Sequence, residues 1–153
     1  MRIRADEHVS PEIVRIVREL ALCPGWEFTH VVDAGGQGTG DVTWITEFAR
    51  DGGDAIVSAD KDFLKRHHQV LAVCQTGLRV IHLPARWANS PCRLQAAHVL
   101  LWWDRIEETL KTCERRQCWR VPWSFSERSE LVRIKVDYER ARKKVKRAGR
   151  RAG

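Results

Sequence analysis

The stretch that decides the expected fold is Ala55-Ile56-Val57-Ser58-Ala59-Asp60-Lys61-Asp62-Phe63. Its first four residues form a short apolar run, which is typical of a strand buried on both faces of a parallel sheet. Two carboxylates, Asp60 and Asp62, follow this strand at once. In open α/β sheets, functional groups gather beyond the carboxyl ends of the strands. The stretch therefore predicts both a parallel sheet and an acidic site at its edge.

Strands and helices alternate along the rest of the chain. Strands are predicted at residues 1–5, 27–32, 55–58 and 80–83, and helices after Ser10, from Asp41, at 64–68 and over 93–118. Ser10 is the expected N-cap of the first helix, with Pro11 in its first turn. The segment 119–125 looks irregular, and a short strand near 132–136 is expected before a helix from about Tyr138. This alternation predicts an α/β fold, a three-layer α/β/α sandwich with a central, mainly parallel sheet.

The acids fall where this fold would bring them together. Asp6 and Glu7 end the first strand, and Asp41 begins the second helix after the glycine-rich loop 33–40. Clustered carboxylates repel one another by several kcal/mol unless a cation neutralises them. Oxygen ligands alone favour Mg²⁺ or Mn²⁺, which assist hydrolysis of phosphodiesters. Taken singly, each acid also has a plainer interpretation: Asp41 and Asp62 as helix caps, and Glu7 as a solvated side chain.

Four segments resemble, in order and spacing, the PIN-like domains, especially the compact group related to VapC toxins of toxin–antitoxin pairs. They are Asp6-Glu7-His8-Val9-Ser10-Pro11, Val32-Asp33-Ala34-Gly35, Gly38-Thr39-Gly40-Asp41 and the run from Ile56 to Phe63. The resemblance covers about residues 1–85. It implies an α/β/α sandwich, a Mg²⁺- or Mn²⁺-dependent ribonuclease, which is a hydrolase, and a small antitoxin protein as partner.

By position, the resemblance also implies the site residues. Asp6, Asp41 and Asp60 would be the metal-binding acids and Asp62 the fourth carboxylate, all four serving catalysis. The sequence departs from the family pattern at two places. Glu7-His8 follows Asp6 where many members have a hydroxyl residue, and Asn89 is the only substitute for an acid beyond the fourth strand.

The C-terminal end is strongly basic. Residues 128–153 contain 11 basic and 3 acidic residues, whereas the preceding 127 contain 16 and 17, within a net charge of +7. We therefore divide the chain into a PIN-like domain, 1–118, and an extension, 119–153. Residues expected to bind RNA phosphates without reading sequence are Arg140, Arg142, Lys143, Lys144, Lys146 and Arg147. An acidic antitoxin surface, or solvent alone, are the other interpretations of this tail.

Other classes fit the sequence less well. An acid pair after a strand also resembles haloacid-dehalogenase phosphatases, but there the motif opens the domain and Phe63 is not the expected neighbour. A response-regulator receiver expects a lysine after a fifth strand, which is not evident before the long helix. A non-catalytic RNA-binding or regulatory protein on a PIN-like fold stays open as the main alternative, and metal-dependent cleavage of RNA would separate it from a nuclease.

The remaining features indicate a reduced, non-membrane setting. The five cysteines form no C-x-x-C pair and are expected to be reduced thiols of a cytoplasmic protein. No apolar run approaches the roughly 20 residues of a membrane helix. The adjacent histidines His67 and His68 point in different directions on a helix, so they are expected to be solvated rather than metal ligands. At least one of Trp102 and Trp103 should pack against the sheet. A second copy of the chain, forming a homodimer, is among the partners considered.

Overall fold

The computed structural model describes residues 1–36, 38 and 40–152. Gln37 and Thr39 of the glycine-rich loop, and Gly153 at the end of the basic tail, therefore lie outside the described residues. The strands are β1 (Arg2–Ala5), β2 (Glu27–His30), β3 (Ala55–Ser58), β4 (Arg79–His82), β5 (Cys118–Arg120) and β6 (Val132–Ile134). The helices are α1 (Pro11–Leu20), α2 (Asp41–Arg50), the 3₁₀ turn η1 (Phe63–Lys65), α3 (His67–Thr76), α4 (Ala85–Ala88), α5 (Cys92–Thr112) and α6 (Tyr138–Ala152).

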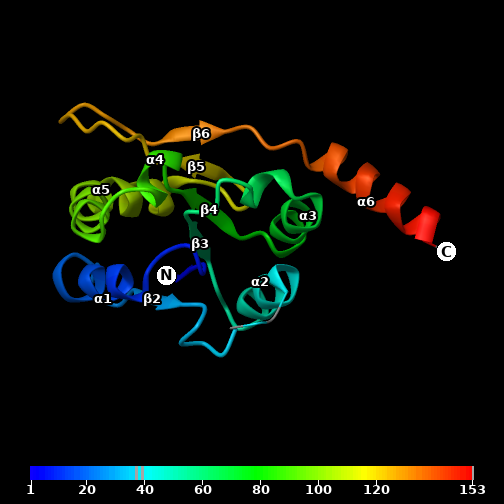
Figure 1. Cartoon of the computed structure of the whole chain (residues 1–153), viewed down its shortest axis with the longest axis horizontal. Helices are drawn as coiled ribbons and strands as arrows, with labels where there is room; N and C mark the ends of the chain where they lie inside the picture. Colours follow the sequence, from blue (N-terminus) through cyan, green and yellow to red (C-terminus); the bar gives the residue numbers. More distant parts are fainter. Residues whose placement is uncertain (37, 39, 153) are drawn as a thin grey trace.

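The strands form one sheet in the order β2-β1-β3-β4-β5-β6. Neighbours from β2 to β5 run parallel, and only β6 is antiparallel to its neighbour. Figure 1 shows α1 and α5 on one face of this sheet and α2 and α3 on the other. The predicted three-layer α/β/α sandwich with a mainly parallel sheet is confirmed.

Strand β3 lies at the centre because it is apolar on both sides. Ala55 and Val57 join the core under α1 and α5, whereas Ile56 joins the core under α2 and α3. All four residues of the strand are buried, as expected for a strand covered by helices on both faces. Trp102 and Trp103 of α5 are both fully buried in the first core. Their packing role is therefore confirmed.

The helix ends follow the sequence signals at α1 but not at α5. Ser10 caps α1 by accepting a hydrogen bond from the Glu12 amide at 3.2 Å. The prediction of one helix over 93–118 was wrong at its C-terminal end, because α5 stops at Thr112 and Cys118 begins β5. Between them the backbone becomes extended at Cys113 (φ −75°, ψ 151°), which ends the helix, and Arg116 adopts a left-handed φ of 71° in the turn that leads to β5.

Two further assignments differ from the sequence prediction. In place of the short helix predicted at 64–68 the chain forms η1 and the longer α3, and part of the segment 119–125 continues β5. Gly40 rather than Asp41 is the N-cap of α2, so Asp41 is the first helical residue. The Asp41 carboxylate is therefore not used as a backbone cap, which leaves it available to neighbouring side chains.

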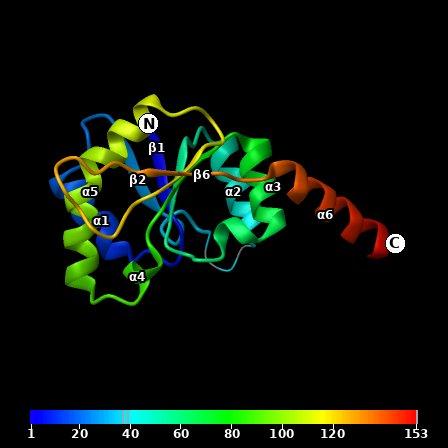
Figure 2. The ribbon, with the colours of Figure 1, turned by 90° about the horizontal axis from the view of Figure 1, so that it is seen from above.

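The strand and the helix expected in the C-terminal segment are both present. β6 extends the sheet, and α6 packs against α3 before leaving the body of the molecule (Figures 1 and 2). Tyr138 anchors the start of α6, because its hydroxyl donates to the carbonyl of Arg116. Within the described part of the chain, no helix combines the length and the apolar character needed to cross a membrane.

Candidate active site

Asp6 lies at the carboxyl edge of the sheet, directly after β1. Parallel pairing of β1 with β3 continues into this residue, since the Asp6 amide donates to the Val57 carbonyl at 3.1 Å. One carboxylate oxygen accepts the His8 amide at 3.0 Å, and the other accepts the Ser58 hydroxyl. Only 4% of Asp6 is exposed. The sheet register therefore fixes this buried carboxylate beside the end of β3.

The charged form of Asp6 is disfavoured where it lies. Burial raises the pKa of the carboxyl above its ordinary value, although the Ser58 hydrogen bond and the nearby His8 act in the opposite direction. The basic side chain that pairs with the Asp6 carboxylate is His8, whose Nδ1 lies 4.0 Å from Oδ1. A buried carboxylate with so little compensation gains stability from any cation that reaches it.

Asp60 shares Ser58 with Asp6. The Asp60 amide donates to Ser58 Oγ at 3.2 Å while the same hydroxyl donates to Asp6, so one serine connects the two acids. Asp60 is also buried, with 6% exposed. Its carboxylate accepts the Asp62 amide at 2.9 Å and the Arg66 guanidinium at 2.7 Å. This pair of buried acids, held at the ends of β1 and β3, is the centre of the candidate site.

Asp41 joins the site from the start of α2. The same Nη1 of Arg66 that contacts Asp60 lies 3.7 Å from Asp41 Oδ2. Trp44 donates to the other Asp41 oxygen at 3.3 Å, and the Gln69 side-chain amide of α3 donates to Oδ2. Asp41 is thus held near Asp60, with the Arg66 side chain between them.

Asp62 is placed differently from the other three acids. Its carboxylate pairs with Lys65 at 3.0 Å and is 40% exposed, and the hydrogen bond from Lys65 lowers its pKa. Asn89, the substitute considered for an acid after the fourth strand, is exposed at the end of α4. Across residues 1–36, 38 and 40–152, no three histidine, cysteine, aspartate or glutamate side chains are arranged to hold one metal ion.

Several residues of the site were not predicted from the sequence. Ser58 had a signal, because a serine that ends a fully buried apolar strand needs a hydrogen-bond partner. Arg66 and Gln69 had none, because their distance in sequence from Asp60 and Asp41 says nothing of the direction of their side chains. His82 also supports the site, since its Nε2 donates to the Asp60 carbonyl at 2.8 Å.

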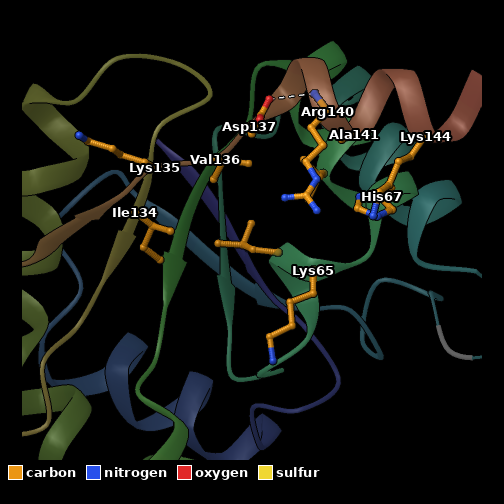
Figure 3. A pocket seen from close by; sticks show the side chains of 11 residues that line it. Lys65, His67, Ile134, Lys135, Val136, Asp137, Arg140, Ala141 and Lys144 are labelled. Carbon is orange, nitrogen blue, oxygen red and sulfur yellow. Dashed lines mark hydrogen bonds between the residues drawn. The ribbon is translucent and has the colours of Figure 1, made fainter.

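All six basic residues predicted to bind nucleic acid are exposed on α6. Arg140 and Lys144 line a hollow of about 400 Å³ between α6, β6 and α3 (Figure 3). Figure 3 shows the Arg140 guanidinium pointing toward the interior of this hollow, while its backbone amide donates to Asp137 at 2.8 Å. One face of α6 therefore presents positive charge to a concave surface.

A second hollow lies between α6 and Asp41. It measures about 460 Å³ and is lined by Asp41 and Arg66 on one side and by Lys144, Val145 and Ala148 on the other. His67 and His68 also line it. The basic helix thus borders the same concavity as part of the acidic site, and a strand lying along α6 would approach Asp41.

The fold and the acids define a class of protein. The buried carboxylates lie at the ends of two neighbouring parallel strands, on the side of the molecule where α6 presents positive charge. Such carboxylates are suited to binding a hard cation near a phosphodiester. Residues 1–85 match the family model described as PIN like domain, and the chain belongs to this family. Its members are commonly nucleases, so a nuclease-type function is indicated in general. Searches of curated proteins and of solved structures found no match.

Proposed function

We propose that this chain is an endoribonuclease that depends on a divalent cation and hydrolyses the phosphodiester bonds of RNA. The observation that carries the proposal is the pair of buried acids, Asp6 and Asp60, joined through Ser58 at the carboxyl edge of a PIN-like sheet. Burial disfavours the charged form of Asp6, and a carboxyl perturbed in this way at the functional edge of a parallel sheet is characteristic of functional sites.

The cation in this proposal is Mg²⁺ or Mn²⁺. Asp6 and Asp60 would hold it, with Asp41 and Asp62 as the further carboxylates. The donor set fits a hard cation in its chemistry, because it consists of carboxylate oxygens and the Ser58 hydroxyl. Asp6 fits in its electrostatics, because burial raises the pKa of a carboxyl that lacks a close basic partner. When bound, such an ion lowers the pKa of a coordinated water and stabilises charge on the phosphate.

Other residues of the chain would position the acids and bind the RNA strand. Ser58 orients the Asp6 carboxylate by donating to it, and His82 restrains the backbone of Asp60. The exposed cations of α6 attract the phosphates of a strand, and the hollow lined by Lys144 and Asp41 would bring that strand beside Asp41. RNA as substrate follows from the family resemblance together with this basic approach.

The first test is cleavage by the purified protein. We expect single-stranded RNA to be cut in Mg²⁺ or Mn²⁺ and to stay intact when a chelator is present, because the cation that would lower the pKa of the attacking water is then removed. Cleavage is measured on an end-labelled RNA, with restoration of activity by Mn²⁺ after chelation as the control. Cleavage that persists at full rate in chelator would contradict the metal-dependent mechanism.

A second candidate is a non-catalytic RNA-binding protein on the same fold. Two observations favour it: Arg66 bridges Asp60 and Asp41, and the described residues provide no group of three metal-ligating side chains. This candidate requires that the protein bind RNA through α6 and leave it uncut in Mn²⁺. The same labelled RNA, examined for binding and cleavage in one experiment, distinguishes the two candidates.

We propose further that the nuclease is the toxin of a toxin–antitoxin pair, acting in the cytoplasm and neutralised by a small antitoxin protein. The support is the resemblance to the VapC group. Induced expression is expected to arrest growth, and Asp6→Asn expressed to the same level is not. A small DNA-binding protein encoded beside the gene should relieve the arrest on co-expression. Equal toxicity of the wild-type and variant proteins would contradict this role.

A further inference from the structure

Arg66 occupies the position between the two acids that α2 and β3 bring near each other. It lies between η1 and α3, and its Nη1 is 2.7 Å from Asp60 Oδ2 and 3.7 Å from Asp41 Oδ2. Both contacts are made by the same nitrogen. The guanidinium therefore bridges two carboxylates that come from different elements of the fold.

The Arg66 bridge compensates the negative charge of the buried Asp60 carboxylate. Asp60 is buried, and an ionised carboxylate removed from water requires an opposite charge close by. Among the ion pairs of the described residues, Asp60 is paired with Arg66 alone. The guanidinium thus does for Asp60 and Asp41 what a bound metal ion would do for a group of acids.

We propose that Arg66 is an exchangeable internal counter-ion, so that a divalent cation binds the site only by displacing the guanidinium from Asp60 and Asp41. The inference rests on the proposed function, because it takes Asp60, together with Asp6 and Asp41, as part of the cation site. Arg66 already occupies Asp60 Oδ2, and a guanidinium beside a divalent ion is repelled strongly in a partly buried site. Cation binding and the Arg66 bridge are therefore mutually exclusive.

The surroundings of Arg66 permit the exchange. Its side chain is 49% exposed, and its backbone is extended (φ −81°, ψ 111°) between η1 and α3 rather than fixed within a helix. Arg66 also lines the hollow that contains Lys144 of α6. Once displaced, the guanidinium remains beside that hollow, where it adds a phosphate-binding group next to Lys144.

The test measures binding of Mn²⁺ rather than catalysis. Free Mn²⁺ is quantified by electron paramagnetic resonance during titration of the wild-type protein, Arg66→Gln and Lys61→Gln. Lys61 is a matched control because it follows Asp60 directly in the sequence, carries the same charge, is exposed, and makes none of the ion pairs found among the described residues. We expect Arg66→Gln to bind Mn²⁺ at least about tenfold more tightly than wild type, and Lys61→Gln to stay within about threefold.

The outcomes separate this inference from the proposed function. Equal affinity of Arg66→Gln and wild type overturns the exchange while the cation site stands. Equal tightening in Arg66→Gln and Lys61→Gln also overturns it, because general electrostatics would then suffice. Absence of Mn²⁺ binding in all three proteins overturns the cation site and the inference together.

A second measurement needs no loss of the arginine. The Arg66 side-chain Nε–Hε signal is followed by nuclear magnetic resonance in the wild-type protein, with Arg66→Lys used only to assign it. Addition of saturating Mg²⁺ is expected to shift this signal toward that of a solvated arginine. An unchanged Arg66 signal, with Mg²⁺ binding detected on neighbouring amides, would overturn the exchange even if Arg66→Gln fails to fold.

Discussion

Asp6→Asn is expected to lower RNA cleavage by about 100-fold or more. Loss of an outer partner of a metal ligand already costs about 10- to 100-fold in activity or affinity, and Asp6 is proposed as a ligand itself. The rate is measured under single-turnover conditions in Mn²⁺. Asp51→Asn is the matched control, because Asp51 is an exposed acid at the far end of α2 that pairs with Arg50. Undiminished cleavage by Asp6→Asn would contradict the assignment.

The same substitution is expected to stabilise the metal-free protein at neutral pH. Burial raises the pKa of Asp6 in the folded state above its ordinary value of 3.8. The folded protein therefore holds this proton more tightly than the unfolded chain, and wild-type stability falls as the pH rises from that value through the folded pKa. Asparagine loses one hydrogen-bond acceptor, but it removes the charge whose desolvation is the largest cause of the shift.

Thermal unfolding in chelator measures this effect, and about 2–4 °C in Tm corresponds to each kcal/mol for a domain of this size. We expect a higher Tm for Asp6→Asn than for wild type at neutral pH, and a smaller difference as the pH falls toward 4. A variant that is both inactive and less stable would indicate a structural role for Asp6 instead. Greater stability with lost activity is the pattern of a residue retained for function.

Removing the cations on the groove side of α6 is expected to weaken RNA binding mainly at low salt. Arg140, Lys144 and Arg147 line the hollows beside this helix. For single strands, the slope of log K against log salt changes by about 0.7 for each phosphate contact. Their combined replacement by glutamine should flatten the slope by about 2 units. Glutamine is a good helix former, so α6 should persist.

The control for this triple variant removes equal charge from the same helix. Arg142 and Lys146 belong to the six residues predicted from the sequence to bind RNA, but they and Arg150 are not among the residues that line those hollows, so a smaller share of the phosphate contacts is expected from these exposed side chains. Their replacement by glutamine should change the slope by less than about 1 unit. Substitution is preferable to truncation, because α6 packs on α3 and Val145 borders the hollow that contains Asp41. Equal slopes for wild type and the groove-side variant would exclude this surface from RNA binding.

The sequence was sufficient for the central part of the fold. Strand β3 has the predicted bounds, Ser10 caps α1 as expected, and the family match covers the residues on which the resemblance was based. These features depend on local patterns, such as an apolar run followed by acids. The end of α5 was missed because the backbone becomes extended at Cys113 and the chain then pairs with β4 through β5, and neither feature leaves a periodic signal.

The acids of the candidate site could be predicted from the sequence, but the ion pairs that these acids make could not. Parallel strands are enough to bring Asp6 and Asp60 to one edge, because the register carries both there. Which cation compensates each acid depends on the reach of long side chains. Lys65 turns to Asp62 and Arg66 to Asp60, although the two basic residues are adjacent. Such choices are made by tertiary geometry, so the Arg66 bridge could only be found in the structure.

The most direct measurement of the central claim is a crystal soaked in Mn²⁺ and examined by anomalous diffraction at the manganese edge. An anomalous peak between the carboxylates of Asp6 and Asp60, with the Arg66 side chain displaced from Asp60, is the result predicted here. A saturating soak that leaves no peak between Asp6 and Asp60, or that places manganese only elsewhere on the surface, would contradict the account.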